Sequence, residues 1–294
     1  MPERADQAAG LRRLFSRERL RVVSFAAGSP GVGKSLLVAN LAACLARQGR
    51  GVLVLDENAG RRDVASCFGK AARYDLADVV DGKKSMAEVL LDAAPGVRVL
   101  PMAVAAGRFG RMDEAQRRAL ETELAALDAP PEVLLADTSL DHPLGFSPLS
   151  LAAHHTVIVM APTPVSITEA YALIKKASLC HARRDYRVLV NGTRGPEGGR
   201  PVFGNVARVT HGRRFARLEY AGCVPLDERL PRAAALGQPA VGLYPDSPAA
   251  RACRALAGEL MDWPLPEGER GGLEQFVRHL LHFCRHMDPV AVYA

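Results

Sequence analysis

Residues 28–35 have the residue types and spacing of a phosphate-binding loop. They read Gly-Ser-Pro-Gly-Val-Gly-Lys-Ser and fit the pattern G-x-x-x-x-G-K-[ST]. Glycines let such a loop curl so that successive backbone N–H groups point at phosphate oxygens. The pattern assigns Lys34 to the β- and γ-phosphates of a nucleotide and the Ser35 hydroxyl to Mg²⁺. An ordinary glycine-rich turn between a strand and a helix is the alternative.

The sequence on either side predicts the context that this chemistry needs. Residues 20–27 are apolar and rich in β-branched side chains, as in a buried strand, and residues 36–46 have a helical pattern that ends at Gly49. A loop between these elements lies at a helix N-terminus, where the helix dipole and unpaired N–H groups favour an anion. Strand, complete motif and helix together favour the phosphate loop.

Asp137 is a second candidate for the same chemistry. It lies near the end of a predicted strand, residues 132–138. A carboxylate at such a strand end is typical of the Walker-B position near Mg²⁺. A helix cap or turn former is the simpler interpretation, but the phosphate loop earlier in the chain favours the functional one.

Alternating strands and helices must position these residues. Further strands are predicted at 51–55, 97–101, 156–160 and 186–190, with helical patterns between most of them. A phosphate loop between the first strand and helix of a strand–helix–strand unit predicts a parallel βαβ arrangement. We therefore expect an α/β fold with a mostly parallel central sheet flanked by helices.

Composition supports a folded protein with helical extensions. The chain has 294 residues, 48% of them hydrophobic, which suits one large α/β domain with extensions or two small domains. We expect a basic N-terminal helix in 1–19, the nucleotide-binding domain in 20–262, and a linker with an amphipathic helix in 263–294. The net charge of +6 suits an acidic partner, anionic lipid or nucleic acid without choosing among them.

The six scattered cysteines and the apolar runs bear on the compartment. No C-x-x-C pair occurs, so buried free thiols in a reducing cytosol are expected. The N-terminal residues do not resemble a signal peptide, and no apolar run is long enough to span a bilayer.

Each extension allows more than one interpretation. Residues 6–19 form a short basic helical pattern, for which a solvated tail is the simplest interpretation. In 273–286, an apolar stripe alternates with basic residues and histidines, which do not make a supported metal site. Such a helix can lie in a membrane interface, dock in a protein groove or pack on its own domain. The stripe contains Phe276, Val277, Leu280 and Leu281, with Cys284.

Taken together, these residues resemble the MinD/ParA group of P-loop ATPases, and within it the FlhG/FleN regulators of flagellar number and placement. Residues 6–12 (DQAAGLR) are similar to the DQAxxLR motif at the start of that family. Residues 161–175 resemble its segment TPEPTSITDAYALIK, and residues 222–260 follow its C-terminal part. The resemblance covers roughly residues 5–262, nearly all of the globular chain.

The resemblance implies ATP and Mg²⁺ as cofactors and an ATP-dependent homodimer. It implies that Asp56 joins Ser35 and Asp137 at the metal, and that the Asn191 amide helps to read adenine. It also implies that the C-terminal helix binds an anionic membrane through its apolar stripe, which would locate a cytoplasmic protein at the inner face of the membrane. The implied nucleotide-binding residues are Gly28, Ser29, Pro30, Gly31, Val32, Gly33, Lys34, Ser35 and Asn191.

The resemblance also gives the N-terminal segment a role, which reverses the solvated-tail interpretation. In FlhG-like proteins this motif binds FlhF, an SRP-type GTPase, and stimulates its GTP hydrolysis. The matching residues are Asp6, Gln7, Leu11 and Arg12, and Gln7 becomes a candidate for orienting the attacking water in the partner. A flagellar transcriptional regulator is a further candidate partner.

Two departures from the family pattern affect hydrolysis. The family's extra lysine, which reaches the partner's nucleotide, is replaced by Ser29, and the next glycine by Pro30. Losing such a cation is comparable to losing an arginine finger, worth about 10³–10⁵ in rate. Asn58 replaces the carboxylate that positions water; its amide can orient water but cannot accept a proton at neutral pH. The segment after Asp137 also lacks the family's usual glycines.

Three hypotheses follow. In the first, the protein is a weak ATPase switch, with Lys34, Asn58 and Asp137 as catalytic candidates, that limits flagellar assembly at the membrane. In the second, it is a non-hydrolysing adaptor that uses the same N-terminal motif and C-terminal helix. In the third, it is a MinD/ParA relative for cell division, DNA partition or cellulose synthesis, which the 6–12 motif opposes.

Overall fold

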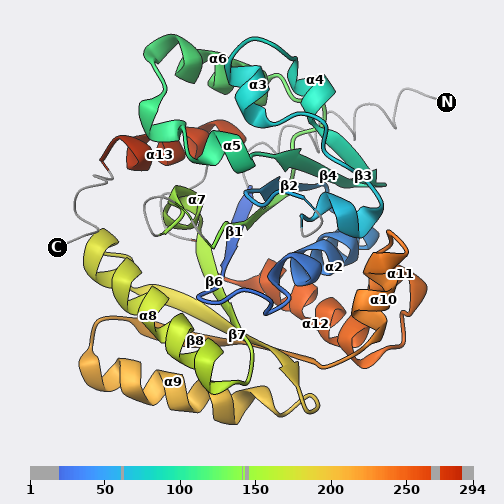
Figure 1. Ribbon diagram of the computed structural model, residues 1–294, viewed down its shortest axis with the longest axis vertical. Helices are drawn as coiled ribbons and strands as arrows, with labels where there is room; N and C mark the ends of the chain where they lie inside the picture. The colour runs from blue at the N-terminus through green and yellow to red at the C-terminus, as the bar shows by residue number, and fades with distance from the viewer. Residues whose placement is uncertain (1–19, 61–62, 141, 143–145, 266–271, 287–294) are drawn as a thin grey trace.

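An eight-stranded sheet forms the centre of the protein in a computed structural model, which describes residues 20–60, 63–140, 142, 146–265 and 272–286 (Figure 1). The strand order is β3-β4-β2-β5-β1-β6-β7-β8. All neighbouring strands run parallel except β3 and β4, which are antiparallel. Helices cover both faces, which confirms the predicted α/β class. The strands are β1 (Arg21–Ala26), β2 (Val52–Asp56), β3 (Leu91–Ala94), β4 (Val97–Pro101), β5 (Val133–Asp137), β6 (His155–Met160), β7 (Asp185–Thr193) and β8 (Arg217–Pro225).

Two sets of helices pack on the sheet because side chains alternate between the two faces of each strand. Val23, Val54 and Leu135 belong to a core shared with α2 and α10 to α12. Val22, Leu53 and Leu134 belong to a second core shared with α3 to α7 and α13. The helices are α2 (Lys34–Arg47), α3 (Leu76–Val80), α4 (Met86–Val89), α5 (Ala103–Ala106), α6 (Glu114–Ala125), α7 (Pro148–Ala152), α8 (Pro164–His181), α9 (Gly199–Arg213), α10 (Arg229–Ala235), α11 (Ala240–Leu243), α12 (Pro248–Asp262) and α13 (Leu273–His286), with the 3-10 turns η1 (Ala65–Phe68) and η2 (Phe109–Arg111).

The central strands β1, β2 and β5 are buried along their whole length, as expected for a parallel sheet covered on both faces. The register pairs Asp56 with Asp137 across β2 and β5, and Phe25 with Asp137 across β1 and β5. The carboxyl ends of these three strands therefore meet at one edge of the sheet. This is the edge at which open α/β sheets bind ligands.

The basic helix of the later chain is shorter than the sequence pattern predicts. Residues 202–218 have a basic helical pattern in the sequence, but α9 ends at Arg213. Arg214 has a φ of 55°, a left-handed conformation that ends the helix, and Arg217 pairs with Asp185 at the start of β8. Sheet pairing with β7 thus overrides the helical pattern at 217 and 218.

Helix α13 packs its apolar stripe on its own domain. Phe276, Val277, Leu280 and Leu281 are each at most 5% exposed. The helix contacts α6, α7 and η2 (Figure 1). Of the three placements open to this helix, the structure has the intramolecular one, because the same apolar stripe completes the second core. In this conformation the four predicted membrane-binding side chains do not face solvent.

The predicted linker begins with an anchored residue. Trp263 is buried, and the Arg21 side chain donates a hydrogen bond to the Trp263 carbonyl oxygen at 2.6 Å. All six cysteines are free and four of them are buried, as expected. Within the described ranges, every helix is too short or too polar to cross a bilayer.

Candidate functional site

The phosphate loop requires glycine at three positions. Gly31 and Gly33 have φ values of 76° and 81°, in the left-handed region that glycine adopts readily. A Cβ at Gly28 would lie 2.3 Å from the backbone carbonyl carbon of Glu169 in α8. The chain therefore reaches the start of α2 only with the backbone freedom that the motif provides. The first turn of α2 holds no acidic residue and no side-chain cap, which leaves its N–H groups available to an anion.

A cavity of about 830 Å³ opens beside this loop. Such a volume lies in the range of small-molecule and cofactor sites. One wall is the loop itself, and the others come from Asn58, from η1, from the segment after β5 and from α10. The lining residues are Ala27, Ser29 to Leu36, Asn58, Ser66, Cys67, Ser139, Leu140, Pro231, Ala234 and Ala235.

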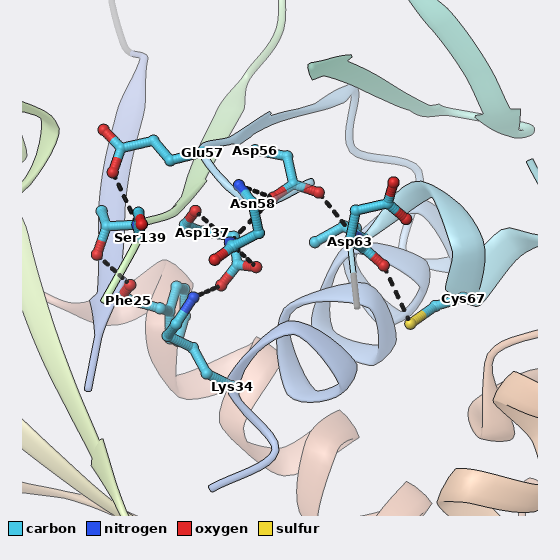
Figure 2. A network of polar contacts seen from close by, with 11 residues as sticks. Phe25, Lys34, Asp56, Glu57, Asn58, Asp63, Cys67, Asp137 and Ser139 are labelled. Atoms are coloured by element: carbon cyan, nitrogen blue, oxygen red, sulfur yellow. Dashed lines mark hydrogen bonds and ion pairs between the residues drawn. The ribbon is translucent and has the colours of Figure 1, made fainter. Parts of the chain in front are cut away.

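The two predicted acidic residues lie together in a buried polar network (Figure 2). The Lys34 ammonium group forms an ion pair with an Asp137 carboxylate oxygen. The Asn58 amide nitrogen lies 3.0 Å from Asp56 Oδ1 and 2.8 Å from Asp137 Oδ2. Asp56 also accepts from the Val64 backbone N–H at 2.6 Å. Asn58 therefore bridges two carboxylates that would otherwise repel each other.

Burial disfavours the charged forms of the carboxylates in this cluster. Burial and, next to it, the nearby charge of Asp137 together raise the pKa of Asp56 to about 7, against hydrogen bonds from Val64 and Asn58 that lower it. Lys34 is the cation of this network, which otherwise contains two carboxylates and an amide. Phosphate-bound Mg²⁺ would supply the positive charge that the pair of carboxylates favours.

The donor set suits Mg²⁺ rather than a metal held by protein alone. In the described part of the chain, no group of three or more His, Cys, Asp or Glu side chains could hold a metal ion. Mg²⁺ in nucleotide sites takes one or two carboxylates and completes its shell with phosphate oxygens and water. Ser35, in the lining of the cavity, and Asp56 and Asp137, beside it, are the groups that fit such a shell.

Asn191 lies against the phosphate loop. Its side-chain nitrogen donates to the Val32 carbonyl oxygen at 2.7 Å, and a Cβ at Gly33 would lie 2.5 Å from it. The Asn191 side chain, near the end of β7, therefore holds the phosphate loop in place. The predicted contact with adenine remains a prediction.

Ser29 is buried where the family has its extra lysine. It is 7% exposed, and its hydroxyl donates to the Ser166 hydroxyl at 3.0 Å. Ser166 in turn accepts from the Ala161 N–H at 3.0 Å. Ser29 therefore fastens the loop to the first turn of α8, whereas Pro30 is exposed. The position offers no cation to a second molecule.

Sequence reasoning missed Glu57 and the wall from α10. Glu57 is 4% exposed and accepts hydrogen bonds from the Ser139 N–H at 2.8 Å and the Ser147 hydroxyl at 2.6 Å. Burial raises the pKa of Glu57 to about 7. The available signal was an acidic residue directly after a strand. No local signal marks α10, which reaches the cavity only through the fold.

One group of predicted residues lies away from this cavity, and a second group is not among the described residues. Phe276, Val277, Leu280 and Leu281 are buried on α13 against α6 and α7. Asp6, Gln7, Leu11 and Arg12 lie outside the described residues.

Comparisons with known proteins agree with this geometry. The model of the CobQ/CobB/MinD/ParA nucleotide binding domain matches residues 23–240, which include the loop, the carboxylates, Asn191 and α10. The chain is 33% identical over 273 residues to antiactivator FleN from Pseudomonas aeruginosa, covering 92% of this chain and 97% of FleN. It is 26% identical over 223 residues to the flagellum site-determining protein YlxH from Helicobacter pylori, covering 72% of each.

Solved structures share the fold. A chain of the MinC:MinD cell division protein complex from Aquifex aeolicus superposes with a TM-score of 0.65 at 25% identity, covering 84% of this chain and 97% of that chain. The septum site-determining protein MinD from Pyrococcus horikoshii, complexed with Mg-ADP, gives a TM-score of 0.56 at 21% identity, covering 82% of this chain and 96% of that chain.

Proposed function

Because this chain belongs to the CobQ/CobB/MinD/ParA family of nucleotide-binding domains, we propose that it is an ATP-binding switch that regulates the number or placement of flagella. The observation that carries the proposal is the complete phosphate loop, with Lys34, opening on a cavity of nucleotide size. Similarity to a flagellar antiactivator over nearly the whole chain supports the flagellar role.

ATP binding would exchange internal contacts for contacts with phosphate. Lys34 now neutralises Asp137, and both would be redirected: Lys34 to the β- and γ-phosphates, and Asp137 with Ser35 and Asp56 to the Mg²⁺ shell. When bound, Mg²⁺ neutralises charge on the phosphates. The ion pair holds the site ready in the absence of nucleotide, because neither charge is left buried alone.

Hydrolysis would be slow or dependent on a partner. Asn58 can orient a water molecule but cannot accept its proton. Ser29 is buried and neutral, so a second copy of the chain receives no cation from this position. The protein is therefore proposed as a weak ATPase whose bound state lasts long enough to act as a signal.

The switch would act on its partners through both the N-terminal and the C-terminal extension. We propose an ATP-dependent homodimer, contact of the 6–12 motif with an FlhF-like GTPase, and contact of α13 with an anionic membrane at the inner face of the cell. A flagellar transcriptional regulator is a further proposed target, which the name antiactivator supports. Membrane contact requires α13 to leave α6 and α7, because its apolar stripe is buried there.

Nucleotide titration of the purified protein tests the switch. Lys34→Ala should weaken Mg-ATP binding by roughly tenfold to a hundredfold, since hydrogen bonds to charged groups contribute about 1.5–3 kcal/mol each. Lys84→Ala is the matched control, because Lys84 pairs with Glu88 away from the cavity. Wild-type protein that fails to bind, or binding that Lys34→Ala leaves unchanged, would reject the switch.

The adaptor is the second candidate, and one observation favours it. Lys34, Asn58, Asp56 and Asp137 are joined to one another by hydrogen bonds and an ion pair between protein groups. An adaptor should retain partner binding in the Lys34→Ala variant, whereas a switch should lose it. A peptide of residues 1–20 that does not stimulate an FlhF-like GTPase would favour the other MinD/ParA roles instead.

A further inference from the structure

Glu57 is a buried carboxylate that is not part of the cavity lining. It directly follows Asp56, the last residue of β2, and its side chain extends away from the Asp56 carboxylate (Figure 2). Its two oxygens accept from two different segments: Oε2 from the Ser139 N–H at 2.8 Å and Oε1 from the Ser147 hydroxyl at 2.6 Å. Both donors follow β5 in the chain.

The two donors have different structural roles. Ser139 and its neighbour Leu140 line the cavity beside the phosphate loop. Ser147 caps α7, since its hydroxyl oxygen also accepts from the Leu149 N–H at 3.1 Å. Helix α7 is buried along its whole length and contacts β1 and β6. The carboxylate thus fastens the cavity wall to a rigid part of the core.

Stability alone does not explain a carboxylate at this place. Burying a carboxylate costs free energy unless hydrogen bonds and charges compensate it. Lys34 favours the charged form of Glu57, but Asp137 opposes it. A small apolar residue would avoid this cost. The benefit of Glu57 is therefore the connection that it makes between the two segments.

The geometry does not depend on the charge of Glu57. A neutral carboxyl group still accepts from the Ser139 N–H, and its own O–H can donate to the Ser147 hydroxyl oxygen, which has two lone pairs. What matters is the length of the side chain and its two polar atoms. Glutamine has both properties, aspartate lacks the length, and alanine lacks both.

We propose that Glu57 is a positioning residue of the nucleotide site: it fixes the wall formed by Ser139 and Leu140 by fastening the segment after β5 to the start of α7. This inference rests on the proposed nucleotide site for its effect on binding. The link itself is made by protein groups alone and can be measured without nucleotide.

Hydrogen exchange in the nucleotide-free, full-length protein measures the link. In Glu57→Ala and Glu57→Asp, the Ser139 amide should exchange about tenfold faster than in wild type, since a hydrogen bond to a charged acceptor is lost. In Glu57→Gln, its exchange should stay within about twofold. Ser178→Ala is the matched control: it removes a buried hydroxyl whose hydrogen bond goes to Tyr186 and not to Glu57, Ser139 or Ser147.

Nucleotide affinity measures the consequence for the site. Glu57→Ala and Glu57→Asp should weaken Mg-ATP binding by about tenfold, while Glu57→Gln should bind at least as well as wild type. Ser178→Ala should lower the midpoint of urea unfolding without changing the affinity. Aspartate keeps the charge and glutamine keeps the length, so this pair separates geometry from electrostatics.

Three outcomes would overturn the proposal. One is wild-type exchange at Ser139 in Glu57→Ala. Another is loss of affinity in Glu57→Gln equal to that in Glu57→Ala, which would make the charge responsible. The third is an equal loss of affinity in Ser178→Ala. If wild-type protein binds no nucleotide, the proposed function fails, and the exchange data still decide whether Glu57 fastens the segment.

Discussion

The two edges of the parallel sheet, where its strands begin and where they end, carry opposite buried charges that are compensated in different ways. At the carboxyl ends, Asp56, Glu57 and Asp137 are buried around Lys34, beside an open cavity. At the amino ends, Arg21 and Arg187 are held against a single aromatic residue, Trp263. There, the Arg187 guanidinium lies 4.3 Å from the Trp263 ring centroid and pairs with Glu219 at 2.7 Å.

The amino end is closed by groups from the protein itself. Trp263 follows α12, yet its carbonyl accepts from Arg21, and its ring meets His155 edge-on at 5.3 Å. Burial lowers the pKa of His155 to about 3 and that of His154 to about 4. These imidazoles are therefore neutral at physiological pH, which limits the positive charge in this cluster.

A ligand site can be told from a structural anchor even when both are rich in buried charge. In the anchor formed by Arg21, Arg187 and Trp263, a distant segment of the chain contacts both cations. In the site, carboxylates outnumber the nearby cation and a cavity adjoins them, so the compensating charge can come from a ligand. Perturbed pKa values occur at both ends and do not by themselves identify function.

The largest expected effect comes from breaking the anchor. Trp263→Ala should lower the free energy of unfolding by about 3–5 kcal/mol, since a buried aromatic side chain is lost. Urea unfolding measures this, with the more exposed Phe283→Ala as control. Nucleotide affinity should not change, because distant sites with no shared partners behave independently. A parallel loss of affinity would show that the two ends are coupled.

A smaller effect is expected when a further carboxylate is added beside Asp56 and Asp137. Asn58→Asp would remove the amide that bridges Asp56 and Asp137 and should lower the stability of the nucleotide-free protein by about 1–3 kcal/mol at pH 8. The loss should shrink as pH falls and the new carboxyl group protonates. Turnover of Mg-ATP should rise by about tenfold or more, because a general base is restored.

Asn205→Asp is the control for this change, since it adds the same charge at an exposed position on α9. Urea unfolding at pH 6 and pH 8 and a phosphate-release assay supply the measurements. Equal stability of the two variants would mean that Asn58 does not relieve repulsion between the carboxylates.

The smallest expected effect is a pair of opposite dependences of folding stability on pH. Glu57 has a pKa of about 7 in the folded protein and near 4.5 when unfolded, so it should increase stability as pH falls through this range. His155 has a lowered pKa in the folded protein, so the unfolded chain binds more protons below pH 6.5, and stability is lost as pH falls. Over its titration range, each group should change the free energy of unfolding by about 1–2 kcal/mol after allowance for solvent screening.

Unfolding midpoints between pH 5 and 8 separate the two slopes. Compared with wild type, Glu57→Gln should lose stability relatively more on acidification, and His155→Gln relatively less. Curves that remain parallel to wild type in both variants would contradict the assignment of the buried charges.

Local patterns were sufficient to predict the phosphate loop, the parallel strands and the acidic strand ends. The loop is a contiguous motif whose glycines have a local conformational reason, and buried strands are contiguous apolar runs. Even the meeting of Asp56 and Asp137 follows from strand ends in a parallel sheet. The loop and the strands depend on residues that are close together in the sequence, and the meeting of the two carboxylates depends only on the parallel order of the strands.

Other features depended on contacts between residues far apart in the chain. Glu57 becomes a link only because Ser139 and Ser147 fold back onto the end of β2. Ser29 turns inward because α8 presents Ser166.

The apolar stripe of α13 shows most clearly what the sequence alone does not determine. Its periodicity determined that one face is buried, but lipid, a partner and its own domain are chemically equivalent partners for that face. Only the tertiary structure, in which α6 and α7 leave apolar surface to be covered, decided that α13 covers it. Burial of apolar surface is non-directional, so its partner cannot be deduced from the stripe itself.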